Sequence, residues 1–152
     1  MRIRALARKR LLPPVMALTP YHGRNRTVLI VEDETVIRHV LKIVLKRMGH
    51  VVLEARDGEE GLTVSRKFNE RIDLVITDIR MPRMDGPTMV RHLQAERPDI
   101  KVLLISGHRA ESIPNDLRMN FLPFLPAAIG QKVQQMFARK KVISPVKGLD
   151  SK

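Results

Sequence analysis

The chain has 152 residues, a formal net charge of +12 at pH 7 and no cysteine. The absence of cysteine excludes disulfides, thiolate catalysis and cysteine-ligated metal sites, and the length suits one globular domain with flanking segments. The charge lies at the ends, because the residues before Thr27 carry +7 and those after Ala138 carry +4, which leaves +1 between them. We therefore expect a basic, disordered extension at residues 1–26, a nearly neutral domain at residues 27–139 and a basic tail at residues 140–152.

The sequence contains no segment suited to crossing a membrane, since no uninterrupted apolar run approaches the roughly 20 residues that a spanning helix needs. The apolar stretch Leu11–Leu18 is interrupted by Pro13 and Pro14, and no clear small-residue cleavage pattern follows it. These features predict a cytoplasmic protein without a membrane partner. Nucleic acid is an alternative partner only for the basic ends, whose binding would then depend on salt.

The first predicted element is a strand at Thr27–Val31, a β-branched and apolar run that suits burial on both faces. From Glu34 onward a helix is predicted, because apolar residues recur at helical spacing until Gly49. Its expected inner face consists of Val36, Ile37, Val40, Leu41, Val44 and Leu45. Its expected solvent-facing side consists of Arg38, Lys42, Lys46 and Arg47.

Two further strand and helix pairs follow along the chain. Val51–Leu53 is predicted as a short strand, Asp57-Gly58 as a turn and Gly61–Phe68 as a helix. Leu74–Thr77 repeats the pattern of a buried strand, and a third helix is expected at about Pro87–Ala95.

The last predicted elements are a strand at Val102–Ile105, a less regular helix at about Glu111–Met119 and a short strand at Phe121-Leu122. A final helix should carry one apolar face, made of Ile129, Val133, Met136 and Phe137. Strands that alternate with helices in this way predict an α/β fold with a doubly wound, five-stranded parallel sheet. Such sheets bind ligands at the carboxyl ends of their strands.

Acidic residues follow two of the strands that we expect to be neighbours: Glu32 and Asp33 after the first, and Asp78 after the third. One acid after a strand is often only a helix cap, but three from two strands favour a site for Mg²⁺, which prefers oxygen ligands. A carboxylate can also accept a phosphoryl group when a metal neutralises the transferring oxygens, and Asp78 is the expected nucleophile. Ser106 could donate a hydrogen bond to a phosphoryl oxygen.

At this point the sequence resembles the receiver domain of bacterial response regulators and hybrid histidine kinases. The resemblance rests on VLIVEDE at Val28–Glu34, DLVITDIRMPRMDG at Asp73–Gly86 and VLLISGH at Val102–His108, and it covers about Arg26 to Arg139. It implies a flavodoxin-like fold and Mg²⁺-dependent phosphorylation in a two-component phosphorelay. The implied partner is a sensor histidine kinase or a histidine phosphotransferase, and the chain is most similar to receivers that are attached to hybrid kinases or work beside them.

The resemblance also implies roles for individual residues. Asp78 would be the phosphoacceptor, Ser106 the switch hydroxyl and Phe121 the switch aromatic. Mg²⁺ would be held by Glu32, Asp33, Asp78 and the backbone carbonyl of Arg80. The chain would then be a self-phosphorylating acceptor and not a turnover enzyme.

The sequence departs from the family where receivers carry Lys-Pro after the fifth strand, because here Phe121–Pro126 reads FLPFLP. The segment between Ser106 and Phe121 is also shorter than is usual in the family. The missing lysine would remove a charge-assisted hydrogen bond to the phosphoryl group, worth about 1.5–3 kcal/mol. Metal binding should survive this loss, whereas switching is affected, and the side chain of Arg80 is one possible source of compensating charge.

Two functions therefore remain open at this level. The first is a phosphorylatable receiver that acts through protein contacts with an unknown downstream partner, because only Lys141–Lys152 remain after the last helix and an output domain is not expected. The second is a degenerate receiver that serves as a phosphorylation-independent interaction module. A metal-dependent hydrolase is not favoured, since there is no phosphate-binding glycine loop and His50, His92 and His108 are expected on the surface.

Overall fold

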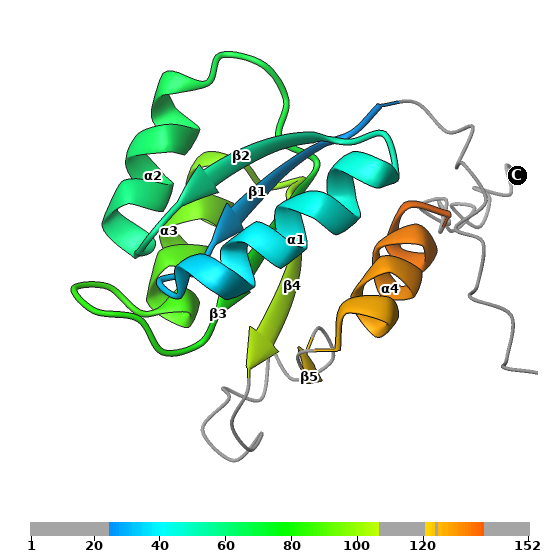
Figure 1. The fold of residues 1–152 in the computed structure, drawn as a ribbon. Helices are drawn as coiled ribbons and strands as arrows, with labels where there is room; N and C mark the ends of the chain where they lie inside the picture. Colours follow the sequence, from blue (N-terminus) through cyan, green and yellow to red (C-terminus); the bar gives the residue numbers. More distant parts are fainter. Residues whose placement is uncertain (1–24, 107–120, 124, 139–152) are drawn as a thin grey trace, which may run out of the picture.

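Five parallel strands form one sheet in the computed structural model of the chain, which describes residues 25–106, 121–123 and 125–138 (Figure 1). The strand order is β2-β1-β3-β4-β5. The strands are β1 (Thr27–Val31), β2 (Val51–Ala55), β3 (Leu74–Asp78), β4 (Lys101–Ser106) and β5 (Phe121–Pro123). The helices are α1 (Thr35–Arg47), α2 (Gly58–Lys67), α3 (Gly86–Glu96) and α4 (Pro126–Ala138). This architecture confirms the predicted fold class.

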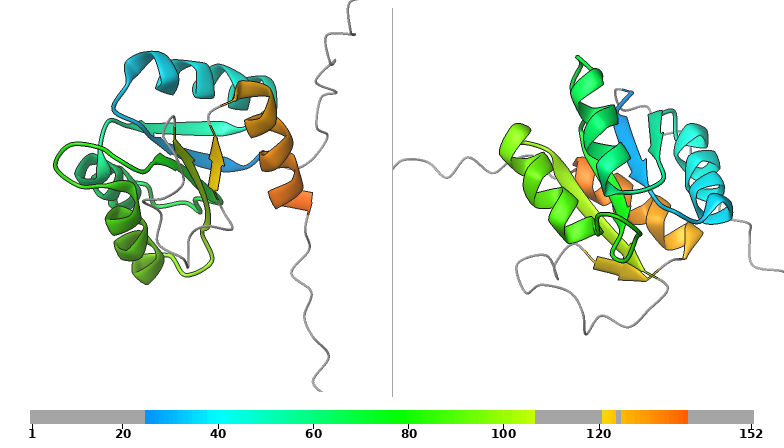
Figure 2. Two further views of the ribbon diagram at one scale, coloured as in Figure 1. Left: turned by 90° about the horizontal axis from the view of Figure 1, so that it is seen from below. Right: turned by 90° about the vertical axis from the view of Figure 1, so that its left-hand side faces the viewer.

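The helices cover both faces of the sheet, with α1 and α4 on one side and α2 and α3 on the other (Figure 2). Side chains of β1 alternate between the two cores: Leu29 and Val31 pack toward α2 and α3, while Val28 and Ile30 pack toward α1 and α4. All four are fully buried. Burial of each such side chain contributes about 1.5–3 kcal/mol, so two hydrophobic cores, one on each face of the sheet, hold β1 between β2 and β3.

Helix α1 begins and ends close to its predicted bounds, but its inner face differs from the prediction. Val36 was expected to be buried, whereas its side chain is 73% exposed. Ile37, Leu41 and Leu45 pack in the core as predicted, and Val36 points away from it because neighbouring helix positions point about 100° apart. The helix stops at Gly49, whose φ of +83° is a conformation that favours glycine.

Helix α2 begins three residues earlier than predicted. Asp57 was expected in a turn, but its side chain accepts a hydrogen bond of 2.9 Å from the backbone N–H of Glu60 and so caps the helix. Strand β2 also runs two residues further than predicted, to Ala55. The remaining strands and helices in the described part of the chain lie within a few residues of the predicted positions, while the expected helix at 111–119 falls outside it.

The prediction that His50 lies on the surface is wrong, because its side chain is only 6% exposed. The turn at Gly49 returns the chain directly into β2, which places His50 under α4, where its ring meets the ring of Phe137 edge-on at 5.3 Å. His92 is exposed as expected, and His108 lies outside the described residues.

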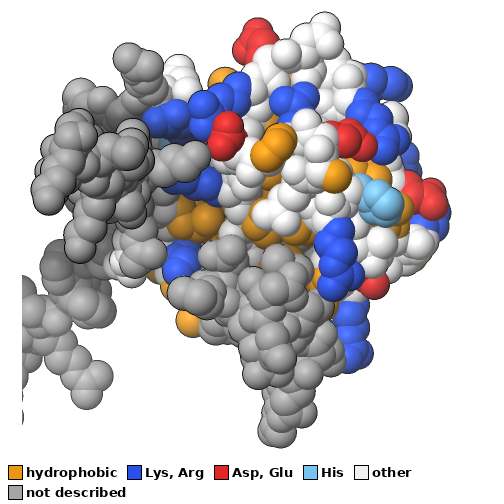
Figure 3. Space-filling model, turned by 180° about the vertical axis from the view of Figure 1, so that it is seen from behind, with side chains coloured by type: hydrophobic (Ala, Val, Ile, Leu, Met, Phe, Trp, Pro, Cys, Tyr) orange, Lys and Arg blue, Asp and Glu red, His pale blue; other side chains and the backbone are white. Residues whose placement is uncertain are grey.

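Basic and acidic side chains are mixed on the surface of the described part of the chain. On the face shown in Figure 3, Lys and Arg side chains occur near Asp and Glu side chains. One exposed ion pair among the described residues joins Arg66 and Glu96, at 2.6 Å. Among the described residues, no helix is both long and apolar enough to span a bilayer.

Candidate functional site

Three carboxylates meet at the carboxyl edge of the sheet. Strands β1 and β3 are parallel neighbours in which Val31 lies beside Thr77, so the next two residues, Glu32 just after β1 and Asp78 at the end of β3, lie at the same edge of the sheet. One carboxyl oxygen each from Glu32, Asp33 and Asp78 lies within 4.8 Å of the others. The grouping expected from the sequence is thus present in the structure.

The three carboxylates differ in their exposure to solvent, since Glu32 is buried, Asp78 is half-buried and Asp33 is exposed. Burial raises the pKa of Glu32 to about 7, and the nearby charge of Asp78 adds to this rise. A hydrogen bond of 3.0 Å from the backbone N–H of Glu34 to the Glu32 carboxylate acts in the opposite direction. Without a bound cation, the carboxylates repel one another.

The donor set fits a hard divalent cation. Mg²⁺ prefers oxygen ligands, usually binds only a few protein groups and keeps several water molecules. Glu32, Asp33 and Asp78 supply three such ligands around one point, and the exposure of Asp33 leaves room for solvent on that side. A cation there would also offset the repulsion between the carboxylates, which adds to the effect of burial on the pKa of Glu32.

Arg38 contacts the backbone that carries the acidic pair, although the sequence indicated that it faces solvent. Its Nη1 donates a hydrogen bond of 2.7 Å to the carbonyl oxygen of Glu32 and another of 3.4 Å to that of Asp33. The available sequence signal was its position in the first turn of α1, because helical side chains lean toward the N-terminal end of their helix.

The loop between β3 and α3 packs tightly beneath Asp78. A Cβ atom on Gly86 would lie 2.0 Å from the carbonyl oxygen of Asp78, so no larger residue fits there. The backbone N–H of Gly86 donates to the carbonyl oxygen of Ile79 at 3.0 Å and closes the loop. Arg80 lies within this loop, and its side chain is exposed.

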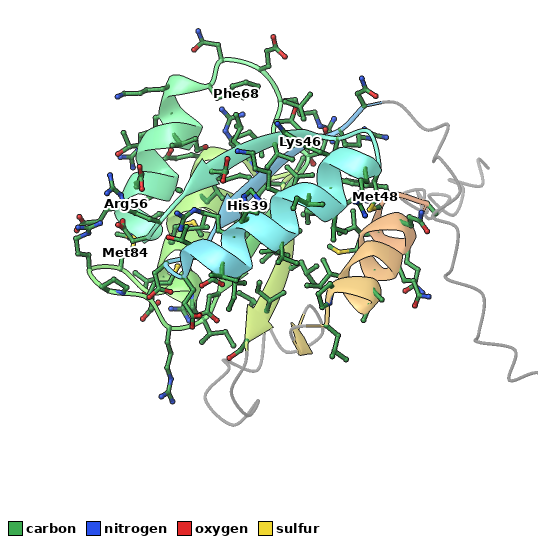
Figure 4. The ribbon with its side chains drawn as sticks, in the orientation of Figure 1. His39, Lys46, Met48, Arg56, Phe68 and Met84 are labelled. Atoms are coloured by element: carbon green, nitrogen blue, oxygen red, sulfur yellow. The ribbon has the colours of Figure 1, made fainter. Side chains whose placement is uncertain are left out.

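The same loop is attached to the start of α2. Arg83 has a φ of +66° and forms an ion pair with the fully buried Asp57, which also caps α2. The N–H of Gly58 donates to the carbonyl oxygen of Met84 at 3.3 Å, and Met84 lies beside the start of α2 in Figure 4. No local pattern in the sequence indicates the pairing between Asp57 and Arg83, because 26 positions separate them.

Ser106 lies at the end of β4, on the strand that neighbours β3. Its side chain is 6% exposed, and the preceding residue, Ile105, lies beside Asp78 in the sheet. Phe121 lies in β5, where it lies beside Leu104 of β4, but its side chain is outside what the structure describes. The structure therefore places Ser106 at the edge where the carboxylates meet. The role of Phe121 as the switch aromatic stays a prediction.

The connection from β5 to α4 is short. Strand β5 ends at Pro123 and α4 begins at Pro126, so only Phe124 and Leu125 separate them. The sequence FLPFLP contains no lysine. No lysine therefore stands between the start of β5 and the start of α4 in the sequence.

Comparisons with known proteins agree with this geometry. The family described as "Response regulator receiver domain" matches residues 28–119. The sensor kinase CckA of Brucella abortus (strain 2308) is 40% identical over 103 residues, which are 65% of this chain and 11% of the kinase. The crystal structure of a receiver domain from the hybrid histidine kinase CckA matches with a TM-score of 0.62 and 34% identity, over 72% of this chain and 97% of that chain.

A complex of CheX and CheY with BeF₃ and Mg²⁺ from Borrelia burgdorferi matches with a TM-score of 0.67 and 28% identity, over 75% of this chain and 90% of that chain. The chain spans only 11% of the length of the CckA kinase, so the activity of that whole protein does not pass to it by similarity. The family match, in contrast, covers more than half of the chain. The chain therefore belongs to the response regulator receiver domain family, the signalling modules of two-component systems.

Proposed function

We propose that this chain is a phosphoacceptor receiver domain in which Asp78 accepts a phosphoryl group from the phosphohistidine of a sensor histidine kinase or a histidine phosphotransferase. The main support is the approach of the carboxyl oxygens of Glu32, Asp33 and Asp78 to within 4.8 Å of one another. These three residues and the backbone carbonyl of Arg80 are the proposed ligands of Mg²⁺. The proposed domain runs over residues 27–139, between the basic ends.

In the proposed reaction, a carboxylate oxygen of Asp78 attacks the phosphorus atom, the bond between phosphorus and the histidine nitrogen breaks, and the imidazole leaves with its electron pair. The product is an aspartyl phosphate. Bound Mg²⁺ would neutralise the charge that builds up on the transferring oxygens. Glu32 and Asp33 would hold the cation beside the acceptor, and the hydroxyl of Ser106 would donate a hydrogen bond to a phosphoryl oxygen.

Incubation with Mg²⁺ and acetyl phosphate, followed by intact mass measurement, tests this proposal. The wild type should gain the mass of one phosphoryl group, and hydroxylamine should remove it because the bond is an acyl phosphate. Asp78→Asn, which keeps the size of the side chain but removes the nucleophile, should gain none. Asp85→Asn is the matched control, because Asp85 caps α3 through an oxygen that asparagine retains. A phosphorylated Asp78→Asn protein would contradict the proposal.

A second candidate function is a phosphorylation-independent interaction module. The observation in its favour is the short connection from Pro123 to Pro126, which carries no lysine to pair with a phosphoryl group. A folded wild type that binds Mg²⁺ but gains no phosphoryl mass would support this alternative. If the wild type is phosphorylated, Arg80→Ala then tests whether Arg80 replaces the missing lysine, since an unchanged rate would exclude that role.

A further inference from the structure

Glu32 is held at both ends of its backbone where β1 leaves the sheet. Its N–H donates a hydrogen bond of 3.0 Å to the carbonyl oxygen of Ala55 in β2. Its carbonyl oxygen lies beyond the last residue of the strand and accepts the bond of 2.7 Å from Arg38. The buried carboxylate therefore projects from a peptide that is fixed by the sheet on one side and by a guanidinium group on the other.

Arg38 is itself held in place on three sides. Its Nη2 donates to the hydroxyl oxygen of Thr35 at 3.3 Å, and its Nε lies 4.0 Å from a carboxylate oxygen of Glu54 in β2. The side chain is 19% exposed. A planar guanidinium can direct several N–H groups at fixed angles, so it can contact two successive carbonyl oxygens and a neighbouring carboxylate together, which a lysine cannot reproduce.

We propose that Arg38 is a positioning residue for the metal site, because it fixes the backbone of Glu32 and Asp33 so that both carboxylates point at Asp78. This inference rests on the proposed function, in which these carboxylates hold Mg²⁺. The three carboxylates lie within 4.8 Å of one another, so their mutual repulsion opposes this arrangement and the contacts of Arg38 with the backbone oppose a displacement of Glu32 and Asp33. Arg38 acts through the backbone and leaves the carboxylate oxygens available as ligands.

Lys42 provides a matched control for the charge of Arg38. It lies one turn further along α1 and pairs with the same Glu54 carboxylate. The structure gives it no contact with the backbone of Glu32 or Asp33 in the described residues. Arg38→Met and Lys42→Met each remove one positive charge from the same helix beside the same acid. Only Arg38→Met also removes the hydrogen bonds to the carbonyl oxygens of Glu32 and Asp33.

Titration calorimetry with MgCl₂ at constant ionic strength tests the inference on wild type, Arg38→Met, Arg38→Lys and Lys42→Met. Arg38→Met should bind Mg²⁺ about 10-fold more weakly than Lys42→Met, as expected when a group that orients metal ligands is lost. Arg38→Lys should fall between wild type and Arg38→Met, because an ammonium can still contact one carbonyl oxygen. With acetyl phosphate, the Mg²⁺ concentration that gives half of the maximal phosphorylation rate should be about 10-fold higher for Arg38→Met than for Lys42→Met.

The outcomes separate this inference from the function on which it rests. If the wild type does not bind Mg²⁺, the proposed function fails and the inference fails with it. If the wild type binds but Arg38→Met and Lys42→Met have the same affinity, only the inference is overturned. Thermal unfolding curves recorded without Mg²⁺ show over which temperatures each variant is folded. If Arg38→Met does not fold, Arg38→Lys replaces it in the test. An affinity of Arg38→Lys for Mg²⁺ equal to that of the wild type then overturns the inference.

Discussion

Gly86 is the residue whose replacement should disturb the acceptor loop most directly. A Cβ atom there would collide with the carbonyl oxygen of Asp78, which belongs to the backbone and cannot move without shifting the strand end. Gly86→Ala should therefore lower the free energy of unfolding by about 1–3 kcal/mol and slow phosphorylation by acetyl phosphate. Urea denaturation and the time course of mass gain measure the two effects.

Gly130 is the control, because a Cβ atom there would lie 3.7 Å from Met48 and Val44, an ordinary contact. Gly130→Ala in the interior of α4 should raise the free energy of unfolding by about 0.5–1 kcal/mol, since alanine restricts the unfolded chain. Equal losses of stability in Gly86→Ala and Gly130→Ala would show that the carbonyl oxygen of Asp78 does not restrict the size of the side chain at position 86.

Asp57 combines a helix cap with an ion pair, and two substitutions separate these contributions. Ser can accept the hydrogen bond from the N–H of Glu60 but cannot pair with Arg83, whereas Ala does neither. Asp57→Ala should therefore be less stable than Asp57→Ser by about 1 kcal/mol, the usual contribution of an N-cap. Chemical denaturation measures both, and equal stabilities would mean that the cap contributes nothing here.

At the scale of elements, Arg97 joins α3 to the end of α2. Its guanidinium donates to three carbonyl oxygens, those of Ser65 at 2.8 Å, Phe68 at 2.6 Å and Glu70 at 2.9 Å, and to the hydroxyl of Ser65. These carbonyl oxygens lie at the end of α2 and just beyond it, where helices leave such groups without partners. Arg97 therefore acts as a C-terminal cap supplied by another helix.

Replacement of Arg97 by Met should lower the free energy of unfolding by about 3 kcal/mol, because several carbonyl groups lose their donor. Compared with the wild type, Arg97→Met should show faster amide hydrogen exchange in the last turn of α2 and a smaller change in α1. Arg66→Met is the control, since Arg66 forms only an exposed pair with Glu96 and its loss should change stability little. An Arg97→Met protein as stable as Arg66→Met would contradict the capping role.

At the scale of the whole molecule, His50 links the first helix and sheet unit to α4. Burial lowers the pKa of His50, and the charge of Arg26 lowers it further, while Asp73 acts in the opposite direction. The folded state therefore binds this proton less readily than the unfolded state does. The contribution of His50 to stability is fully present above its unfolded pKa of about 6.5 and is lost as the pH falls through the folded value.

The free energy of unfolding of the wild type should therefore fall, relative to that of His50→Leu, as the pH is lowered below about 6.5, by at most about 1.4 kcal/mol per pH unit. Urea denaturation at several pH values measures this difference. A constant difference between wild type and His50→Leu would show that His50 titrates alike in both states.

Much of this molecule could be predicted from the amino-acid sequence, because the decisive patterns are local. The runs TVLIV and LVIT are short, β-branched and apolar, and strand formation at these positions needs no knowledge of the rest of the chain. The grouping of Glu32, Asp33 and Asp78 also follows, because parallel strands end at one edge of their sheet. The family resemblance then pointed to the same three residues.

The supporting contacts were decided only by the tertiary structure. Asp57 pairs with Arg83 across 26 positions, and Arg97 reaches Ser65 across 32, distances at which hydropathy and charge patterns carry no pairing information. The exposure of Val36 and the burial of His50 depended on how α1 is rotated on the sheet and where α4 packs. The amino-acid sequence thus determined the order of the elements and the acidic residues at the strand ends, whereas long-range packing decided which charged side chains hold that edge in place.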